Sequence, residues 1–119
     1  MTDITLTLPW PAKALLSNAR VHWAAKARAT AAARREAWIT ALQVGVRGMG
    51  PEAVLEFTLH PPDNRRRDVQ NMPGTMKAVI DGIADAMGCD DRLFQCVFPT
   101  RFAEVWPGGA VVVRISPGE

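Results

Sequence analysis

The segment from Ala24 to about Val44 contains neither glycine nor proline, and it is rich in alanine and arginine. This composition favours a long helix, and that helix constrains the fold more than any other feature of the chain. Apolar side chains that recur at helical spacing are expected to form its buried stripe: Ala27, Ala31, Trp38 and Leu42.

Strand and helix patterns alternate around this segment. Ile4–Leu8 alternates apolar and polar residues, as a half-buried strand does, and prolines end it. The other predicted elements are a strand Val54–His60, a helix Pro73–Met87, and strands Phe94–Phe102 and Ala110–Ile115. The order β-α-β-α-β-β predicts an α+β fold. We expect a single small domain over residues 1–119, with a mixed sheet of about four strands and two helices.

Composition excludes several classes of protein. With 48% hydrophobic and 22% charged residues, the chain resembles an ordinary globular protein and not a disordered one. No apolar run approaches the roughly 20 residues of a membrane span, and the N-terminus lacks the pattern of a secretory signal. Cys89 and Cys96 are too few for a disulfide framework. We therefore expect a cytoplasmic protein without a membrane partner or a small-molecule cofactor.

The formal net charge of +2 conceals a segregated charge pattern. Basic residues dominate between Lys13 and Arg47, where Glu36 is the one acid, whereas Asp81 to Asp91 carries acids and no base. Segregation of this kind attracts an anionic partner even when the total charge is small.

The most informative segment runs from Arg65 to Asn71. Arg65, Arg66 and Arg67 suit phosphate binding, because a guanidinium donates two parallel hydrogen bonds to phosphate oxygens. Asp68 would weaken such a site unless a divalent cation lay between it and the phosphate, and Mg²⁺ binds in this way. The competing interpretation, about equally favoured by this segment alone, is a solvated loop in which Asp68 pairs with an arginine.

A second acidic feature follows the second predicted helix. Asp90 and Asp91 repel each other unless a cation or protons relieve them, and we expect them at an edge of the sheet. Together with Asp68 they indicate a metal-dependent phosphodiester site, in which Lys77 neutralises charge on the phosphate. The alternatives are a polar turn for the acidic pair and an ordinary salt bridge from Lys77 to Asp81.

Weaker candidates for DNA contact lie before and in the first helix. They are Trp10, which stands between prolines, and the basic or imidazole side chains of Arg20, His22 and Lys26. For His22 a purely structural role is favoured, and His60 is expected to be a packing or capping residue.

Along almost its whole length the chain resembles the RusA-type Holliday junction resolvases. The resemblance lies in Leu8–Pro11, in Pro62–Asn71, in Lys77–Asp81 and in the pair Asp90–Asp91. It implies a RusA-like fold and a homodimer that cuts four-way DNA junctions symmetrically with Mg²⁺ or Mn²⁺, in a phage or prophage setting of DNA recombination and repair. Asp68 and Asp91 match the metal-ligand positions of that family, Lys77 matches its catalytic lysine, and the arginines and Asn71 fall in the same block.

The chain departs from the family pattern at one metal position. Where the pattern reads Arg-Asp-x-Asp-Asn, this chain has Gln70, an amide that offers a carbonyl oxygen with less charge. Asp81, Asp85 and Asp90 are candidates to compensate as ligands. The alternative functions are therefore a DNA-binding homologue with little or no cleavage and, third, a homomeric structural protein whose arginines are only solvated.

Overall fold

The computed structural model describes residues 3–16, 22–49 and 52–118. Its centre is a mixed sheet of four strands, β1 (Ile4–Leu8), β2 (Val54–His60), β3 (Gln95–Val97) and β4 (Ala110–Ser116), in the order β1-β4-β2-β3. Strand β4 is antiparallel to both of its neighbours, and Val113 lies opposite Leu6 on one side and Phe57 on the other. The short β3 pairs in parallel with β2 at the edge of the sheet.

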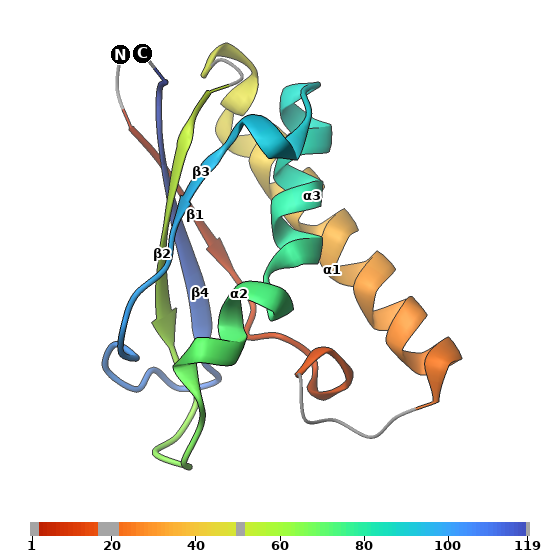
Figure 1. Cartoon of the computed structure of the whole chain (residues 1–119), viewed down its shortest axis with the longest axis vertical. Coiled ribbons are helices and arrows are strands. Elements are labelled where there is room, and N and C mark those ends of the chain that lie inside the picture. The colour runs from red at the N-terminus through yellow and green to blue at the C-terminus, as the bar shows by residue number, and fades with distance from the viewer. Residues whose placement is uncertain (1–2, 17–21, 50–51, 119) are drawn as a thin grey trace.

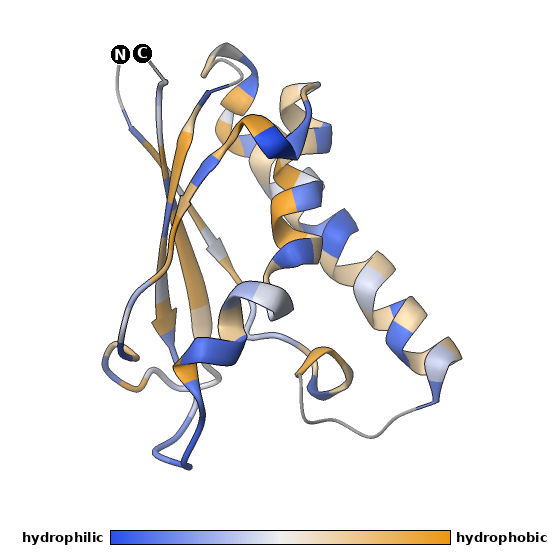
Figure 2. Cartoon of the chain, viewed as in Figure 1, coloured by the Kyte–Doolittle hydropathy of each residue, from blue (hydrophilic) through white to orange (hydrophobic). Residues whose placement is uncertain are grey.

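Three helices, α1 (Trp23–Val44), α2 (Met72–Thr75) and α3 (Lys77–Met87), lie on one side of the sheet (Figure 1). The alternation of exposed and buried residues in β1 turns Leu6 and Leu8 toward the core, as the sequence predicts. Figure 2 shows apolar residues along the strands and on α3, whereas the segment after β2 is strongly hydrophilic. The structure is therefore a small, compact α+β domain, which confirms the predicted fold class.

Both ends of α1 are fixed by local sequence. The side chain of His22 accepts a hydrogen bond from the amide of Ala24 at 3.2 Å and so caps the first turn. At the other end Gly45 adopts a left-handed conformation with φ of +80°, which ends the helix. The predicted helix is confirmed, and it begins one residue earlier than predicted, at Trp23.

The buried side of α1 is not the one that the sequence predicts. Ala37 and Ala41 are fully buried, whereas Ala27 and Ala31 are exposed and Trp38 keeps 38% of its surface. The cause is Gly82 on α3, where a Cβ atom would overlap the backbone of α1 at Arg34 and the side chain of Ala37. The two helices therefore approach closely at Gly82, and the small side chain of Ala37 lies in this contact. Of the predicted stripe, only Leu42 packs against the core.

The second predicted helix is divided in two. Met76, with φ of −82° and ψ of −1°, separates the single turn of α2 from α3. The apolar positions of the predicted helix behave as expected, since Met76 at the break and Val79, Ile80 and Ile83 of α3 are all buried. The predicted strand Phe94–Phe102 is reduced to Gln95–Val97, because Phe98 packs instead against Phe57 and Pro99 cannot continue a ladder. No helix among the described residues is long and apolar enough to span a membrane.

Candidate nucleic-acid interface

The loop after β2 borders a cavity of about 410 Å³ at one end of the sheet. The segment before the first helix forms the opposite wall with Trp10, Pro11 and Lys13. The charged side chains around this cavity are predominantly basic: Lys13, Asp63, Arg65, Arg66, Arg67 and Asp68. We call this cavity the basic pocket. It brings together Trp10, the three arginines, Asp68 and Asn71, all of which the sequence places in a DNA-binding site.

Asp63 holds the arginine loop in shape. Its Oδ1 accepts the amide of Arg65 at 2.9 Å and lies 2.9 Å from Nη2 of Arg67. The hydrogen bond from the Arg65 amide, followed by the Arg67 guanidinium, keeps the pKa of Asp63 below its ordinary value. The arginine partner is thus Asp63, and no described arginine pairs with Asp68, in contrast to the solvated-loop interpretation.

The three arginines differ in their freedom. Arg67 is 17% exposed, and its Nη1 also donates to the carbonyl oxygens of Asp63 and Arg65. Arg65 is 80% exposed and reaches Asp63 only at 3.9 Å, a contact of little energetic weight at a surface. Arg66 forms no hydrogen bond or salt bridge with a described residue. The pocket therefore has one structural arginine and two whose charges are available to an anion.

Trp10 positions Arg67. The guanidinium carbon lies 5.6 Å from the centre of the indole ring, within the range of a cation–π interaction. The ring also packs on Phe102 with a centroid distance of 6.2 Å. Because Trp10 is engaged by both neighbours, its direct contribution is to hold a charge in place.

Asp68 begins the short turn Val69–Asn71 at the rim of the basic pocket. Its Oδ1 accepts the amide of Gln70 at 2.9 Å, and its Oδ2 lies 3.5 Å from Nδ2 of Asn71. The exposed carboxylate keeps unused lone pairs, as a metal ligand requires. The side chain of Gln70 is exposed and forms no hydrogen bond with a described residue.

Lys77 and Asp91 form a separate cluster beside α3. The Nζ of Lys77 lies 2.5 Å from Oδ2 of Asp91 and 3.0 Å from Oδ1 of Asp81. Both carboxylates raise the pKa of Lys77, and Asp91 has the larger effect. The predicted pair with Asp81 is therefore present together with a second one.

The other acids of this region are occupied by arginines. Asp85 accepts two hydrogen bonds from Arg34 of α1, at 2.6 and 2.8 Å. Asp90 caps the turn Asp91–Leu93 and pairs with Arg92 at 2.8 Å. Arg92 keeps the pKa of Asp90 below its ordinary value through its side chain and then its amide. As predicted, the Asp90–Asp91 pair precedes an edge strand.

The structure does not unite the two clusters. Figure 1 draws the turn that follows Asp68 below α2, and the turn that contains Asp91 beside α3 toward the other end of the sheet. Within the described ranges there is no group of three His, Cys, Asp or Glu side chains that would hold a metal ion. The donors at the basic pocket fit a Mg²⁺ ion held by one carboxylate and a bound phosphate, but not a preformed site made by protein alone.

The remaining candidates have other surroundings. His22 caps α1 and Lys26 is exposed on that helix, outside the basic pocket, and Arg20 falls outside the described residues. His60 is buried, as predicted, and its ring stacks on Trp106 at 3.5 Å. Lys13 is missing from the sequence-based site, and only its place at the start of the basic stretch that ends at Arg47 could have indicated it. Gly108 and Gly109, in the loop between β3 and β4, both have positive φ, as expected for glycines in a turn.

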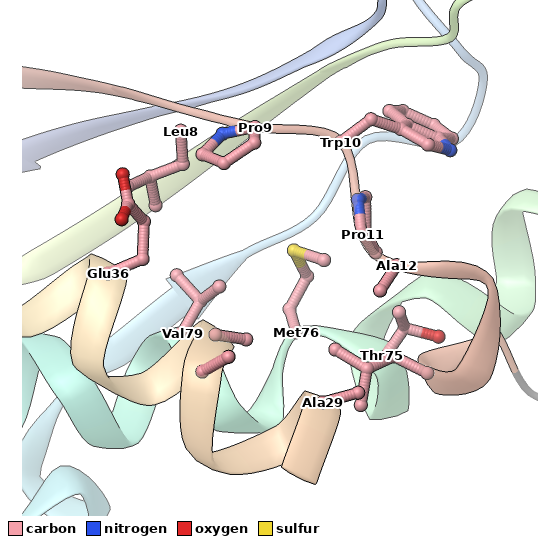
Figure 3. A pocket seen from close by; sticks show the side chains of 13 residues that line it. Leu8, Pro9, Trp10, Pro11, Ala12, Ala29, Glu36, Thr75, Met76 and Val79 are labelled. Carbon is pink, nitrogen blue, oxygen red and sulfur yellow. The ribbon is translucent and has the colours of Figure 1, made fainter. Parts of the chain in front are cut away.

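A second cavity of about 380 Å³ also has Trp10 in its lining. Its lining is mostly apolar and comes from the end of β1, from α1 and from the start of α3 (Figure 3). Met76 and Val79 point toward this cavity, and Glu36 lies at its far end from Trp10. This cavity lacks cations, so an anionic partner has no reason to enter it.

Fold and site together define a small α+β protein with a basic, aromatic-walled pocket beside its sheet. No known family model matches the chain. An uncharacterized protein of Xylella fastidiosa (strain Temecula1 / ATCC 700964) is 40% identical over 116 residues, which cover 94% of this chain and 75% of that protein. The chain belongs to the same family as that protein.

Proposed function

We propose that this protein is a metal-dependent DNA endonuclease of the RusA type that cuts branched DNA, such as four-way junctions. The observation that carries the proposal is the basic pocket, in which Arg65 and Arg66 keep their charges available while the Asp68 carboxylate stands at the rim. Consecutive phosphates of a DNA backbone are the ligand that matches several cations on one loop.

The charges of the pocket divide the work of binding. Arg67, paired with Asp63 and packed on the ring of Trp10, keeps the loop in shape. Arg65 and Arg66 are free to follow neighbouring phosphates, and Lys13 adds a further cation to the lining of the pocket. Binding should therefore weaken with added salt, as counterions are no longer released as favourably.

Asp68 is the residue that would hold a divalent cation. A Mg²⁺ ion takes one or two carboxylates together with phosphate oxygens and waters, so one aspartate beside a phosphate-binding loop is a sufficient protein contribution. When bound, such an ion activates a water molecule and stabilises charge on the leaving oxygen. The side-chain carbonyl oxygen of Gln70, in the same turn, would be an additional ligand for that ion.

A second candidate function is favoured by the separation of the carboxylates. Asp91 is occupied by Lys77 and lies in a different cluster from Asp68, and Gln70 is neutral. A DNA-binding homologue without cleavage would have this arrangement.

The RusA proposal also includes a homodimer, a cytoplasmic location and a role in recombination or repair of prophage-related DNA.

A nicking assay separates the two candidates. The purified protein is incubated with a labelled synthetic four-way junction over a range of Mg²⁺ and Mn²⁺ concentrations. The nuclease predicts paired nicks that Asp68→Asn abolishes while junction binding persists. Asp85→Asn is the matched control, because that aspartate pairs with Arg34 away from the basic pocket.

Binding without nicking at every metal concentration would reject the nuclease. A gain of cleavage in Gln70→Asp would then identify a homologue whose activity depends on that missing carboxylate. Wild-type protein that binds neither junction nor duplex DNA would reject both candidates. Junction affinity that does not change with salt would also contradict a phosphate-binding pocket.

A further inference from the structure

The loop between β3 and β4 presents a tryptophan that the proposed phosphate contacts do not use. Trp106 keeps 36% of its surface exposed. Its backbone amide donates to the carbonyl of Pro61 at 3.1 Å, and its carbonyl accepts the amide of Gly109 at 2.8 Å. Backbone bonds on both sides therefore fix the position from which the ring projects.

His60 supports one face of the Trp106 ring. The two rings are nearly parallel, with an angle of 7° and a centroid distance of 3.5 Å. His60 is 7% exposed, and its Nδ1 lies 2.9 Å from the carbonyl oxygen of Glu104, which implies that Nδ1 donates. Since His60 covers one face, the accessible surface of Trp106 belongs to the opposite face and the ring edge.

The backbone of the turn that carries this ring lies next to the segment that leads into the arginine loop. Pro61, which holds the amide of Trp106, is followed at once by Pro62 and Asp63 in the wall of the basic pocket. A Cβ atom on Gly109 would meet both Trp10 and Pro62, so the Trp106 turn also lies against that wall from its other end. The turn that carries Trp106 therefore adjoins the wall of the basic pocket, and a nucleic acid that extends from the pocket across this turn would meet its ring.

We propose that Trp106 is a stacking platform for an unpaired base of the bound DNA. The inference rests on the proposed function, since it takes the DNA as bound through the basic pocket. A base within a duplex has both faces covered by its neighbours, whereas a base at a branch point or in a single strand offers a free face. Stacking on an aromatic side chain accepts any base, so the contact selects unpaired structure and not sequence.

The rigidity of Trp106 makes the contact favourable. A ring held by His60 and by two backbone hydrogen bonds loses little freedom when a base stacks on it. Trp10 is unsuited to this role because Arg67 and Phe102 already engage it. The platform thus distinguishes open from paired DNA, while the arginines bind both.

The test uses a four-way junction and a gapped duplex that carry 2-aminopurine at the branch nucleotide or in the gap. Stacking on Trp106 changes the fluorescence of this base when wild-type protein binds. Trp106→Leu is expected to abolish that change and to weaken binding of the gapped DNA about 10-fold, with fully paired duplex affinity unchanged. Trp106→Phe keeps a ring and should retain most of the signal. Trp38→Leu is the matched control, since that ring has a similar exposure, 38%, on α1.

A wild-type fluorescence response that persists in Trp106→Leu overturns the platform, as does equal affinity of Trp106→Leu and wild type for gapped DNA. Circular dichroism checks the fold of Trp106→Leu. If this variant does not fold, the 2-aminopurine responses of the wild-type and Trp106→Phe proteins test the platform instead. A wild-type protein that binds DNA without any 2-aminopurine response refutes the platform but leaves the proposed function intact. Absence of DNA binding by the wild type refutes both.

Discussion

The ammonium group of Lys77 lies 2.5 Å from the carboxylate of Asp91, with a second carboxylate, that of Asp81, at 3.0 Å. These anions raise the pKa of Lys77, and Asp91 contributes most. The substitution Asp91→Asn is therefore expected to lower the pKa of Lys77 toward its ordinary value. An NMR titration of the Lys77 side chain in protein with ¹³C-labelled lysine measures this change.

Asp85→Asn provides the control for that titration, because Asp85 is bound by Arg34, whereas the salt bridges of Lys77 are with Asp81 and Asp91. The pKa of Lys77 should be the same in this variant as in the wild type. If Asp91→Asn left the pKa of Lys77 as it is in the wild type, the Lys77–Asp91 ion pair would be refuted.

Gly82 determines how closely α1 and α3 approach. A Cβ atom there would overlap the carbonyl of Arg34 and the side chain of Ala37, so Gly82→Ala must push the helices apart. Overpacking of this kind costs about 1–3 kcal/mol of unfolding free energy, which a urea denaturation curve measures. Gly74→Ala is the matched control, since a Cβ atom on Gly74 meets nothing within 4 Å. Equal stability of the two variants would contradict the close contact.

The Arg34–Asp85 pair joins α1 to α3 and predicts a dependence on acid. The Arg34 guanidinium lowers the pKa of Asp85 by hydrogen bonding and then by its charge. A carboxylate with a lowered pKa stabilises the fold above its ordinary pKa, and this stabilisation is lost as the pH falls through the lowered value. The melting temperature of Asp85→Asn should therefore lie below that of the wild type near neutral pH, and the difference should shrink in strong acid. A difference that stays constant from neutral to acid pH would refute this linkage.

Trp10 acts on DNA through Arg67. Trp10→Leu removes the ring beneath the guanidinium at 5.6 Å but leaves all cations in place. We expect junction affinity to fall about two- to fivefold, as the loss of a cation–π contact of about 0.5–1 kcal/mol implies. The dependence of affinity on salt should keep its slope, because no phosphate contact is removed.

Arg66→Ala should behave differently, since it removes one charge that faces the pocket. The slope of log affinity against log salt is expected to fall by about 0.9 for each lost phosphate contact with duplex DNA. Arg47→Ala, on an exposed residue outside the pocket, is the control for general charge effects and should leave the slope nearly unchanged. A steeper loss of slope in Trp10→Leu than in Arg66→Ala would reverse the assigned roles.

Three of the four strands and the long helix could be predicted because their signals are local. Alternation in Ile4–Leu8, the prolines after His60, and the glycine at the end of α1 each act within a few residues. The buried side of α1 could not be predicted, since alanines occupy several sides of this helix. The contact with Gly82 selects among them, and that contact joins segments far apart in the chain.

The site could be predicted in part for the same reason. The arginines, Asp68 and Asn71 are neighbours in sequence and remain so in the basic pocket. The roles of Asp63, Trp10 and Trp106 depend on loops that meet only in the folded chain. The spacing of the residues in sequence also did not show that Asp91 would lie beside Lys77 and apart from Asp68. That arrangement depends on the break at Met76 and on the length of α3.

The start of β1 and the end of β4 lie side by side at the end of the sheet that is away from the basic pocket (Figure 1). Ile4 of β1 is paired with Ile115 of β4, and Asp3 forms a salt bridge with Arg114. A tether, dye or fusion partner attached beyond either strand would therefore leave the pocket facing outward. A form of this protein that is linked to a surface beyond either strand would hold its arginine loop on the side away from that surface.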